Sequence, residues 1–176
     1  VKKGFNTKPV FYKNGTTREV YFIGNYTGYT SIYKINLDAE TEEEKEPELV
    51  IEGEKSDEFE AFHLFQSRLD ISPDGVLAFV TKKGESDALH LYDVKHRYLI
   101  RTLQFNNIVV LASPHWSPDG TKIVFAANDK AGKMDLYLYD LRNEQLQRLT
   151  DDSYDDRDPV WTPDGKRIVF SSDRTP

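Results

Sequence analysis

The chain has 176 residues, a formal net charge of −7, no cysteine and one methionine, which suits one soluble domain or a piece of a larger one. The lack of cysteine excludes a disulfide framework and thiol chemistry. The longest uncharged apolar run, Ile108 to Ala112, is far shorter than the roughly 20 residues of a membrane span, so we expect no membrane insertion.

The first predicted elements carry a hydrophobic pattern and then give way to a strongly acidic segment. PVFYKNGTTREVYFIG begins at Pro9, and SIYKINL, rich in residues typical of half-buried strands, begins at Ser31. The segment from Asp38 to Glu60 contains twelve acidic residues and two basic ones, Lys45 and Lys55. We interpret this segment as a solvated surface excursion, because blocks of like charge repel one another.

A common phrase then recurs along the chain. It reads LDISPDGVLAFV from Leu69, PHWSPDGTKIVFAA from Pro114 and PVWTPDGKRIVFSS from Pro159, and its glycines Gly75, Gly120 and Gly165 are 45 residues apart. The phrase at Pro9 is a degenerate copy, 60 residues before Gly75, and the extra length matches the acidic segment. A period of about 45 residues with strand-rich content is typical of the blades of a β-propeller.

One repeat contains four predicted strands. In the third repeat these are residues 115–117, 122–127, 135–141 and 145–149, and a tight Ser-Pro-Asp-Gly turn joins the first two. Proline fixes φ at one corner of this turn, and glycine accepts positive φ at its exit. The structural residues of the repeated motif are Pro73, Asp74, Gly75, Trp116, Pro118, Asp119, Gly120, Trp161, Pro163, Asp164 and Gly165.

The fold class that follows is all-β: a β-propeller of four-stranded antiparallel blades, with about three and a half blades present. The predicted blades cover residues 9–66, 67–113 and 114–157, with a half blade at 158–176. Closed propellers use about four to eight blades, so residues 168–171 should form an open edge. We expect a piece of a longer chain, or self-association of two arcs through their open edges.

The phrase PHWSPDGTKIVF, followed by DLYLYDL and RLT, resembles the propeller repeat of TolB-like proteins. The resemblance implies a six-bladed ring in the complete family fold, a scaffold without cofactors for protein contacts or substrate gating, and a location in the bacterial periplasm or cell envelope. Similar repeats occur in the propellers of prolyl-oligopeptidase-like and tricorn-like peptidases. The first copy has Lys13 and Asn14 in place of Pro-Asp, so its turn should differ in shape.

The sequence contains no catalytic motif that we recognise. It has no G-x-S-x-G elbow, no H-E-x-x-H helix and no phosphate-binding glycine-rich loop. Ser72 and Ser117 lie in the repeated turns, where we interpret them as turn formers. We therefore expect a non-enzymatic protein-binding module. The alternatives are the substrate-gating propeller of a peptidase whose catalytic domain lies outside this chain and, third, a carbohydrate-active propeller enzyme with a metal in its channel.

Partner binding is expected on the face formed by two sets of loops. The loops that join blades (52–67, 104–113 and 151–158) should share this face with the loops between second and third strands (24–30, 81–87 and 128–133). The candidate partner-binding residues are Asp151, Asp152, Asp155, Asp156, Arg157, Glu58, Glu60 and His63. The partner would be another protein or the rest of a longer chain. A pI of about 5.1 and the lack of a basic stripe argue against nucleic acid.

Two clusters contain side chains of the kinds that bind metal ions. Asp151, Ser153 and Asp155 imitate the first ligands of a calcium loop, but the glycine and glutamate that complete such a loop are missing. Turn capping, with Asp158 paired to Arg157 or to a backbone amide of the next blade, explains them better. Glu58, Glu60 and His63 could approach an ion near the channel, although packing is the simpler role. We therefore expect no metal and no cofactor.

Overall fold

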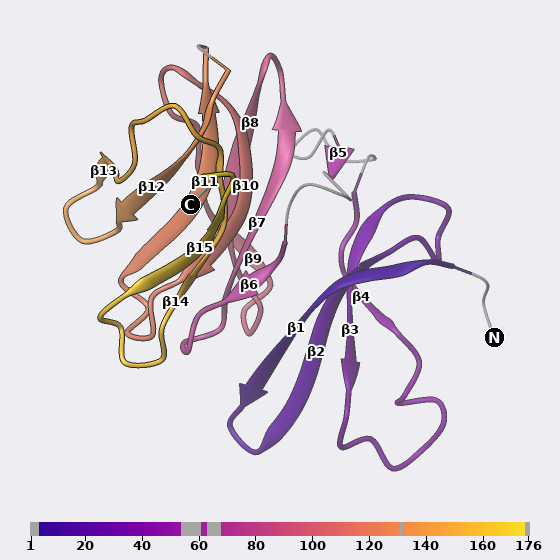
Figure 1. Cartoon of the computed structure of the whole chain (residues 1–176). Coiled ribbons are helices and arrows are strands. Elements are labelled where there is room, and N and C mark those ends of the chain that lie inside the picture. Colours follow the sequence, from indigo (N-terminus) through magenta and orange to yellow (C-terminus); the bar gives the residue numbers. More distant parts are fainter. Residues whose placement is uncertain (1–3, 54–60, 63–67, 131, 175–176) are drawn as a thin grey trace.

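A computed structural model describes residues 4–53, 61–62, 68–130 and 132–174 of the chain. In these residues the regular structure consists of β-strands, arranged in four antiparallel sheets that follow one another along the chain (Figure 1). The same residues contain no helix long and apolar enough to cross a membrane. The all-β prediction is confirmed. The sheets depart from the predicted blade bounds, since residues 61–62, predicted in the first blade, pair within the second sheet, and residues 156–157, predicted in the third blade, belong to the last sheet.

The strands have the following bounds. Blade 1 contains β1 (Asn6–Asn14), β2 (Thr17–Gly24), β3 (Ser31–Asn36) and β4 (Glu48–Ile51). Blade 2 contains β5 (Ala61–Phe62), β6 (Asp70–Ile71), β7 (Val76–Lys83), β8 (Ser86–Asp93) and β9 (Tyr98–Leu103), and both β5 and β6 pair with β7. Blade 3 contains β10 (Ile108–Trp116), β11 (Lys122–Asp129), β12 (Met134–Asp140) and β13 (Gln145–Arg148). The half blade contains β14 (Asp156–Trp161) and β15 (Ile168–Ser172).

The first strands of the later blades begin earlier than predicted. The predicted loop 104–113 belongs to β10 from Ile108 onward, and the predicted loop 151–158 belongs to β14 from Asp156 onward. The reason is a local irregularity in each first strand, which interrupts the apolar alternation that marks a strand in the sequence.

The repeated turns have the predicted structural role. In blade 3 the Gly120 amide donates to the Ser117 carbonyl at 2.8 Å, and the Lys122 amide donates to the Ser117 hydroxyl at 2.9 Å. The same serine hydroxyl donates to Asp119, and this bond, together with those from Thr121, lowers the pKa of the Asp119 carboxyl to about 2. The serine is thus a turn former. In blade 1, Asn14 pairs directly with Thr17, so that turn has the different shape that was expected.

The hydrophobic cores lie between blades. Leu77 and Phe79 of β7 pack toward blade 1, whereas Ala78 and Val80 of the same strand pack toward blade 3, where they join Trp116. Successive side chains of a strand point to opposite faces, so a central strand with both faces buried joins two neighbouring cores. A smaller third core links blade 3 to Ile168 of the half blade. This is the arrangement of a propeller, in which each blade is stabilised by stacking on its neighbours.

Hydrogen bonds also link successive blades at repeated positions. The Trp116 amide donates to the Asp70 carboxylate at 2.6 Å, and the Trp161 amide donates to Nδ1 of His115 at 3.3 Å. Each acceptor lies five residues before the turn glycine of its own blade. The bond therefore repeats with the blade, although the acceptor is a carboxylate in one copy and an imidazole in the next.

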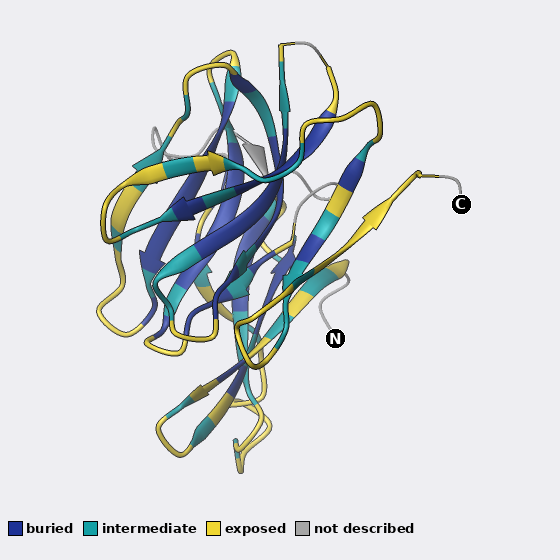
Figure 2. Cartoon of the chain, turned by 60° about the vertical axis from the view of Figure 1, so that its left-hand side comes forward, coloured by how far each residue is buried: buried dark blue, intermediate teal, exposed yellow. Residues whose placement is uncertain are grey.

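The half blade has an open outer strand. β15 pairs with β14 and is exposed along most of its length (Figure 2), with Val169 61% exposed. The open edge predicted at residues 168–171 is therefore present.

Candidate functional site

The first strands of the blades share a backbone irregularity. β1, β10 and β14 each carry a register shift against the second strand of their blade. Within these shifts Lys8, Ser113 and Asp158 have φ angles of 55°, 50° and 51°. Such angles are uncommon for residues other than glycine, and backbone strain of this kind often occurs at functional sites. The three residues occupy the same position, seven residues before the turn glycine of the blade.

A proline follows each of these strained residues. Pro9, Pro114 and Pro159 have no amide proton to donate to a sheet, and a proline within a strand is normally placed at an edge or a bulge. The irregularity is therefore encoded by the proline of each repeat. It re-aims the side chain of the preceding residue, as bulges commonly do.

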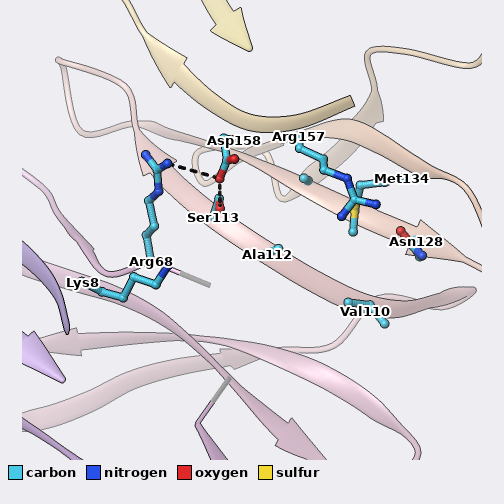
Figure 3. Close-up of a pocket in the computed structure, with 10 residues that line it drawn as sticks. Lys8, Arg68, Val110, Ala112, Ser113, Asn128, Met134, Arg157 and Asp158 are labelled. Carbon is cyan, nitrogen blue, oxygen red and sulfur yellow. Dashed lines mark hydrogen bonds and ion pairs between the residues drawn. The ribbon is translucent and has the colours of Figure 1, made fainter. Parts of the chain in front are cut away.

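The corresponding position in blade 2 is Arg68. The four first-strand elements are neighbours, because β6 contacts both β1 and β10, and β10 contacts β14. The four side chains therefore gather about the axis that the blades surround. Asp158 accepts a hydrogen bond from the Ser113 hydroxyl at 2.7 Å and forms an ion pair with Arg68 at 3.5 Å, with Lys8 on the same side (Figure 3). The partners of Asp158 are thus Ser113 and Arg68, whereas the prediction gave Arg157 or a backbone amide of the next blade.

These residues open into a cavity of about 420 Å³, which we call the axial cavity. It is lined by Lys8, Arg68, Val110, Ala112, Ser113, Ala126, Asn128, Met134, Arg157 and Asp158. Among the described residues its lining has three cationic side chains and one carboxylate, and one of the cations, Arg157, forms an ion pair with Asp155. Its volume lies within the range of about 300–1,000 Å³ that is typical of ligand sites.

The wall of the axial cavity at the half blade is held by Asp155. Its carboxylate accepts the Met134 amide at 3.1 Å and the Arg157 guanidinium at 2.7 Å. These two bonds, the backbone one first, lower the pKa of the Asp155 carboxyl. Asp155 therefore positions both Arg157 and the start of β12 on this wall.

The cavity wall also contains an unsatisfied polar atom. Among the described residues, Oδ1 of Asn128 is a buried oxygen without a hydrogen-bond partner, while its amide nitrogen donates to the Gly132 carbonyl at 3.4 Å. Buried acceptors without donors are rare in folded proteins. A ligand with an N–H group would satisfy this oxygen.

Of the loops expected to share one face, those of blades 2 and 3 lie together in the described residues. Gln104, between blades 2 and 3, donates to the Lys83 carbonyl at 3.1 Å, and Lys133, between β11 and β12, donates to the Asp152 carbonyl at 3.4 Å. This face, which we call the loop face, exposes three aromatic side chains from different loops and strand ends: Phe5, Tyr29 and Tyr154. Aromatic residues are enriched where proteins bind one another.

Three of the predicted partner-binding carboxylates lie at the loop face but are held by basic side chains or amides. Asp151 pairs with Arg148 at 3.0 Å, and Asp155 is engaged as described above. Asp152 accepts the Tyr154 amide at 2.9 Å and pairs with Arg174, and these bonds lower the pKa of its carboxyl. The structure therefore brings them together as turn-capping groups.

The position of Asp156 differs from the prediction, which groups it with the exposed acidic residues of this loop. Asp156 is 0% exposed and is the first residue of β14. Its carboxylate accepts two hydrogen bonds from Arg174, at 2.7 and 3.1 Å. The strand alternation turns its side chain inward while its neighbours face solvent. Glu58, Glu60 and His63 lie outside the described residues. Within the described residues, no group of three or more potential ligands is arranged to hold a metal.

The prediction from sequence missed Lys8, Arg68 and Ser113. The signal that could have found two of them, and Asp158, is the residue before the proline of each repeat, since a proline inside a predicted strand indicates a bulge. Arg68 precedes Leu69 rather than proline, so only its distance from Gly75 reveals its equivalence.

Blades stacked on one another around a polar cavity, with their first strands innermost, define an open, partial β-propeller. The family model for the TolB β-propeller domain matches residues 56–176, and the chain belongs to this family. No curated protein sequence matches the chain.

Similar solved structures include two TolB proteins. TolB from Acinetobacter baumannii matches with a TM-score of 0.73 and 18% identity, over 94% of this chain and 37% of that protein. A TolB-like protein from Agrobacterium tumefaciens matches with a TM-score of 0.67 and 20% identity, over 88% of this chain and 50% of that protein. A puromycin-hydrolysing peptidase from Mycobacterium tuberculosis matches with a TM-score of 0.58 and 20% identity, over 84% of this chain and 21% of that protein. The chain thus spans half or less of the length of each.

Proposed function

We propose that this chain is a non-enzymatic interaction module of a bacterial cell envelope, and that it binds a protein partner through the loop face. The observation that carries the proposal is the loop face itself, where exposed aromatic side chains stand on loops that hydrogen bonds tie to one another. Loops fixed in this way lose little conformational entropy on binding. Membership of the TolB β-propeller family supports both the partner class and the envelope location.

Site-specific photo-crosslinking in cells tests the proposal. A photoreactive residue replaces Tyr29 or Tyr154 on the loop face and, as a matched control, Lys95 or Lys166 near the turns at the opposite end of the blades. We expect crosslinks to one defined protein from the first pair only, and direct binding of that protein when both are purified. Crosslinks from the control pair alone would contradict the proposal.

The similarity to the peptidase from M. tuberculosis favours a second candidate, a propeller that admits substrates to a separate catalytic domain. The two candidates differ in what the complete gene encodes. A G-x-S-x-G segment with later aspartate and histidine, after the propeller repeats, would support substrate gating and refute the scaffold.

A further inference from the structure

We propose that the bond between Asn14 and Gly15 is a site of spontaneous chemical modification, at which the folded chain converts Asn14 to a mixture of aspartate and isoaspartate. Asn14 is the last residue of β1 and pairs with Thr17, so Gly15 lies in the turn at the end of blade 1 (Figure 1). Asn14 is the one asparagine of the sequence that precedes a glycine. The inference depends on neither the loop face nor the axial cavity.

The reaction joins the backbone nitrogen of one residue to the side chain of the residue before it. The nitrogen of Gly15 attacks Cγ of Asn14, its proton leaves with the side-chain nitrogen as ammonia, and a cyclic succinimide remains. Water then opens the ring at Cγ, which gives aspartate, or at the backbone carbonyl carbon, which gives isoaspartate. Glycine favours the attack because it has no Cβ to crowd its nitrogen.

The structure leaves both reacting groups available. Among the described residues, neither the side-chain amide of Asn14 nor the N–H of Gly15 forms a hydrogen bond. Gly15 is exposed, and a Cβ built on it would have no neighbour within 4 Å. Hydroxide therefore reaches the N–H that must be deprotonated, and the succinimide ring has room to form.

The other three repeated turns hold the corresponding nitrogen in a hydrogen bond. Their Asp-Gly pairs form the same ring with loss of water, but the amides of Gly75, Gly120 and Gly165 donate to the carbonyl three residues earlier at 3.0, 2.8 and 2.8 Å. The carboxylates of Asp119 and Asp164 also accept hydrogen bonds from the Ser or Thr of their own turns. The degenerate first copy of the turn is therefore the reactive one.

The product changes the end of blade 1. It adds one negative charge, and in isoaspartate the main chain runs through Cβ and Cγ, which lengthens it by one carbon beside the pair of Asn14 and Thr17. Tyr12, two residues earlier in β1, belongs to the core between blades 1 and 2. We therefore expect modification to weaken the packing of blade 1 on blade 2.

Mass spectrometry of the tryptic peptide of residues 14–18 tests the proposal. The purified chain is kept in mildly alkaline buffer, either folded or unfolded in urea, and isoaspartate is detected by enzymatic carboxyl methylation. We expect the amide-to-acid mass gain in this peptide, at a folded rate within about tenfold of the rate in urea, or about 1.4 kcal/mol in activation free energy. Modification in urea without modification of the folded chain would overturn the proposal.

The Asp-Gly turns are controls within the same molecule. The ratio of the folded rate to the rate in urea should be at least about tenfold smaller at Asp119 and Asp164 than at Asn14, because folding engages their glycine amides. Equal ratios at the three positions would refute the protective role of those hydrogen bonds.

Two variants locate the reaction and its effect. Asn14→Gln has a longer side chain that disfavours ring closure and should abolish the mass gain, whereas a gain at the wild-type rate would refute the site. Asn14→Asp adds the charge without the extra carbon, so the modified wild type, isolated by ion exchange, should unfold at a lower urea concentration than this variant. Equal midpoints would refute the effect of the lengthened main chain.

Discussion

Protonation of His90 should make the stability of the chain depend on pH well above the range in which carboxylates titrate. His90 lies in β8, is 0% exposed and stacks on Phe79, with its two ring nitrogens 2.8 Å from Thr81 Oγ1 and 3.1 Å from Thr102 Oγ1. Burial, and to a lesser extent the positive charge of Lys83, lower the pKa of His90 to about 4. The folded chain therefore favours the neutral imidazole.

The magnitude follows from the difference between the two states. In the unfolded chain a histidine has a pKa of about 6.5, so on acidification the unfolded state takes up the proton first and is stabilised relative to the folded state. The loss of stability begins near pH 6.5 and is complete near pH 4. Each unit of pKa difference corresponds to about 1.4 kcal/mol, so lowering the pH from about 7.5 to about 5.5 should cost about 1.3 kcal/mol through this residue alone.

Urea unfolding followed by tryptophan fluorescence at several pH values measures this effect, with His90→Gln as the control. Glutamine keeps hydrogen-bonding capacity toward the two threonines but does not titrate. The wild type should lose about 1.3 kcal/mol more than the variant between these two pH values. Equal losses in the two proteins would show that His90 does not carry the pH dependence.

Two further predictions concern the blades. Asp156→Asn should lower the free energy of unfolding by about 1.5–3 kcal/mol, because it weakens charged hydrogen bonds to a buried group, whereas Asp152→Asn at the exposed rim should cost less than about 1 kcal/mol. Equal effects in urea unfolding would contradict the inward position of Asp156. Gly75→Ala should cost about 1–2 kcal/mol more than Gly120→Ala, since both have positive φ but a Cβ at Gly75 would lie 2.6 Å from the Tyr12 hydroxyl. Tyr12→Phe should recover most of this excess in thermal unfolding, and no recovery would exclude the clash as its cause.

The fold was largely predictable because its strongest signals are local and repeated. The Ser-Pro-Asp-Gly turns and the alternating strands after them depend on neighbours in the sequence, and they recur at a spacing of 45 residues. The start of β10 at Ile108 was not predicted, because the bulge before His115 interrupts its alternation. An interruption of the apolar alternation is interpreted as a loop unless the strand that pairs with the segment is known.

The candidate site was less predictable, since it depends on which residues different blades bring together. Asp151 and Asp156 belong to one acidic stretch, yet Asp151 is exposed and Asp156 is buried against Arg174. Arg68 and Asp158 are 90 residues apart and meet only when two blades are correctly placed about the axis. The acidic composition of residues 151–158 indicates a site on the loop face, whereas the axial cavity combines residues that come from different blades.

A comparison of two repeated positions indicates why the axial residues are candidates for function rather than for folding. Five residues before the turn glycine, Asp70 and His115 differ in kind but both accept the backbone N–H of the next blade, so the fold constrains their chemistry. Seven residues before it, Lys8, Arg68, Ser113 and Asp158 comprise two cations, a hydroxyl and an anion. The backbone strain recurs in three of these copies while the side-chain chemistry does not, so the strain positions side chains whose identity the fold leaves open. Residue choice at that position is then available for recognition.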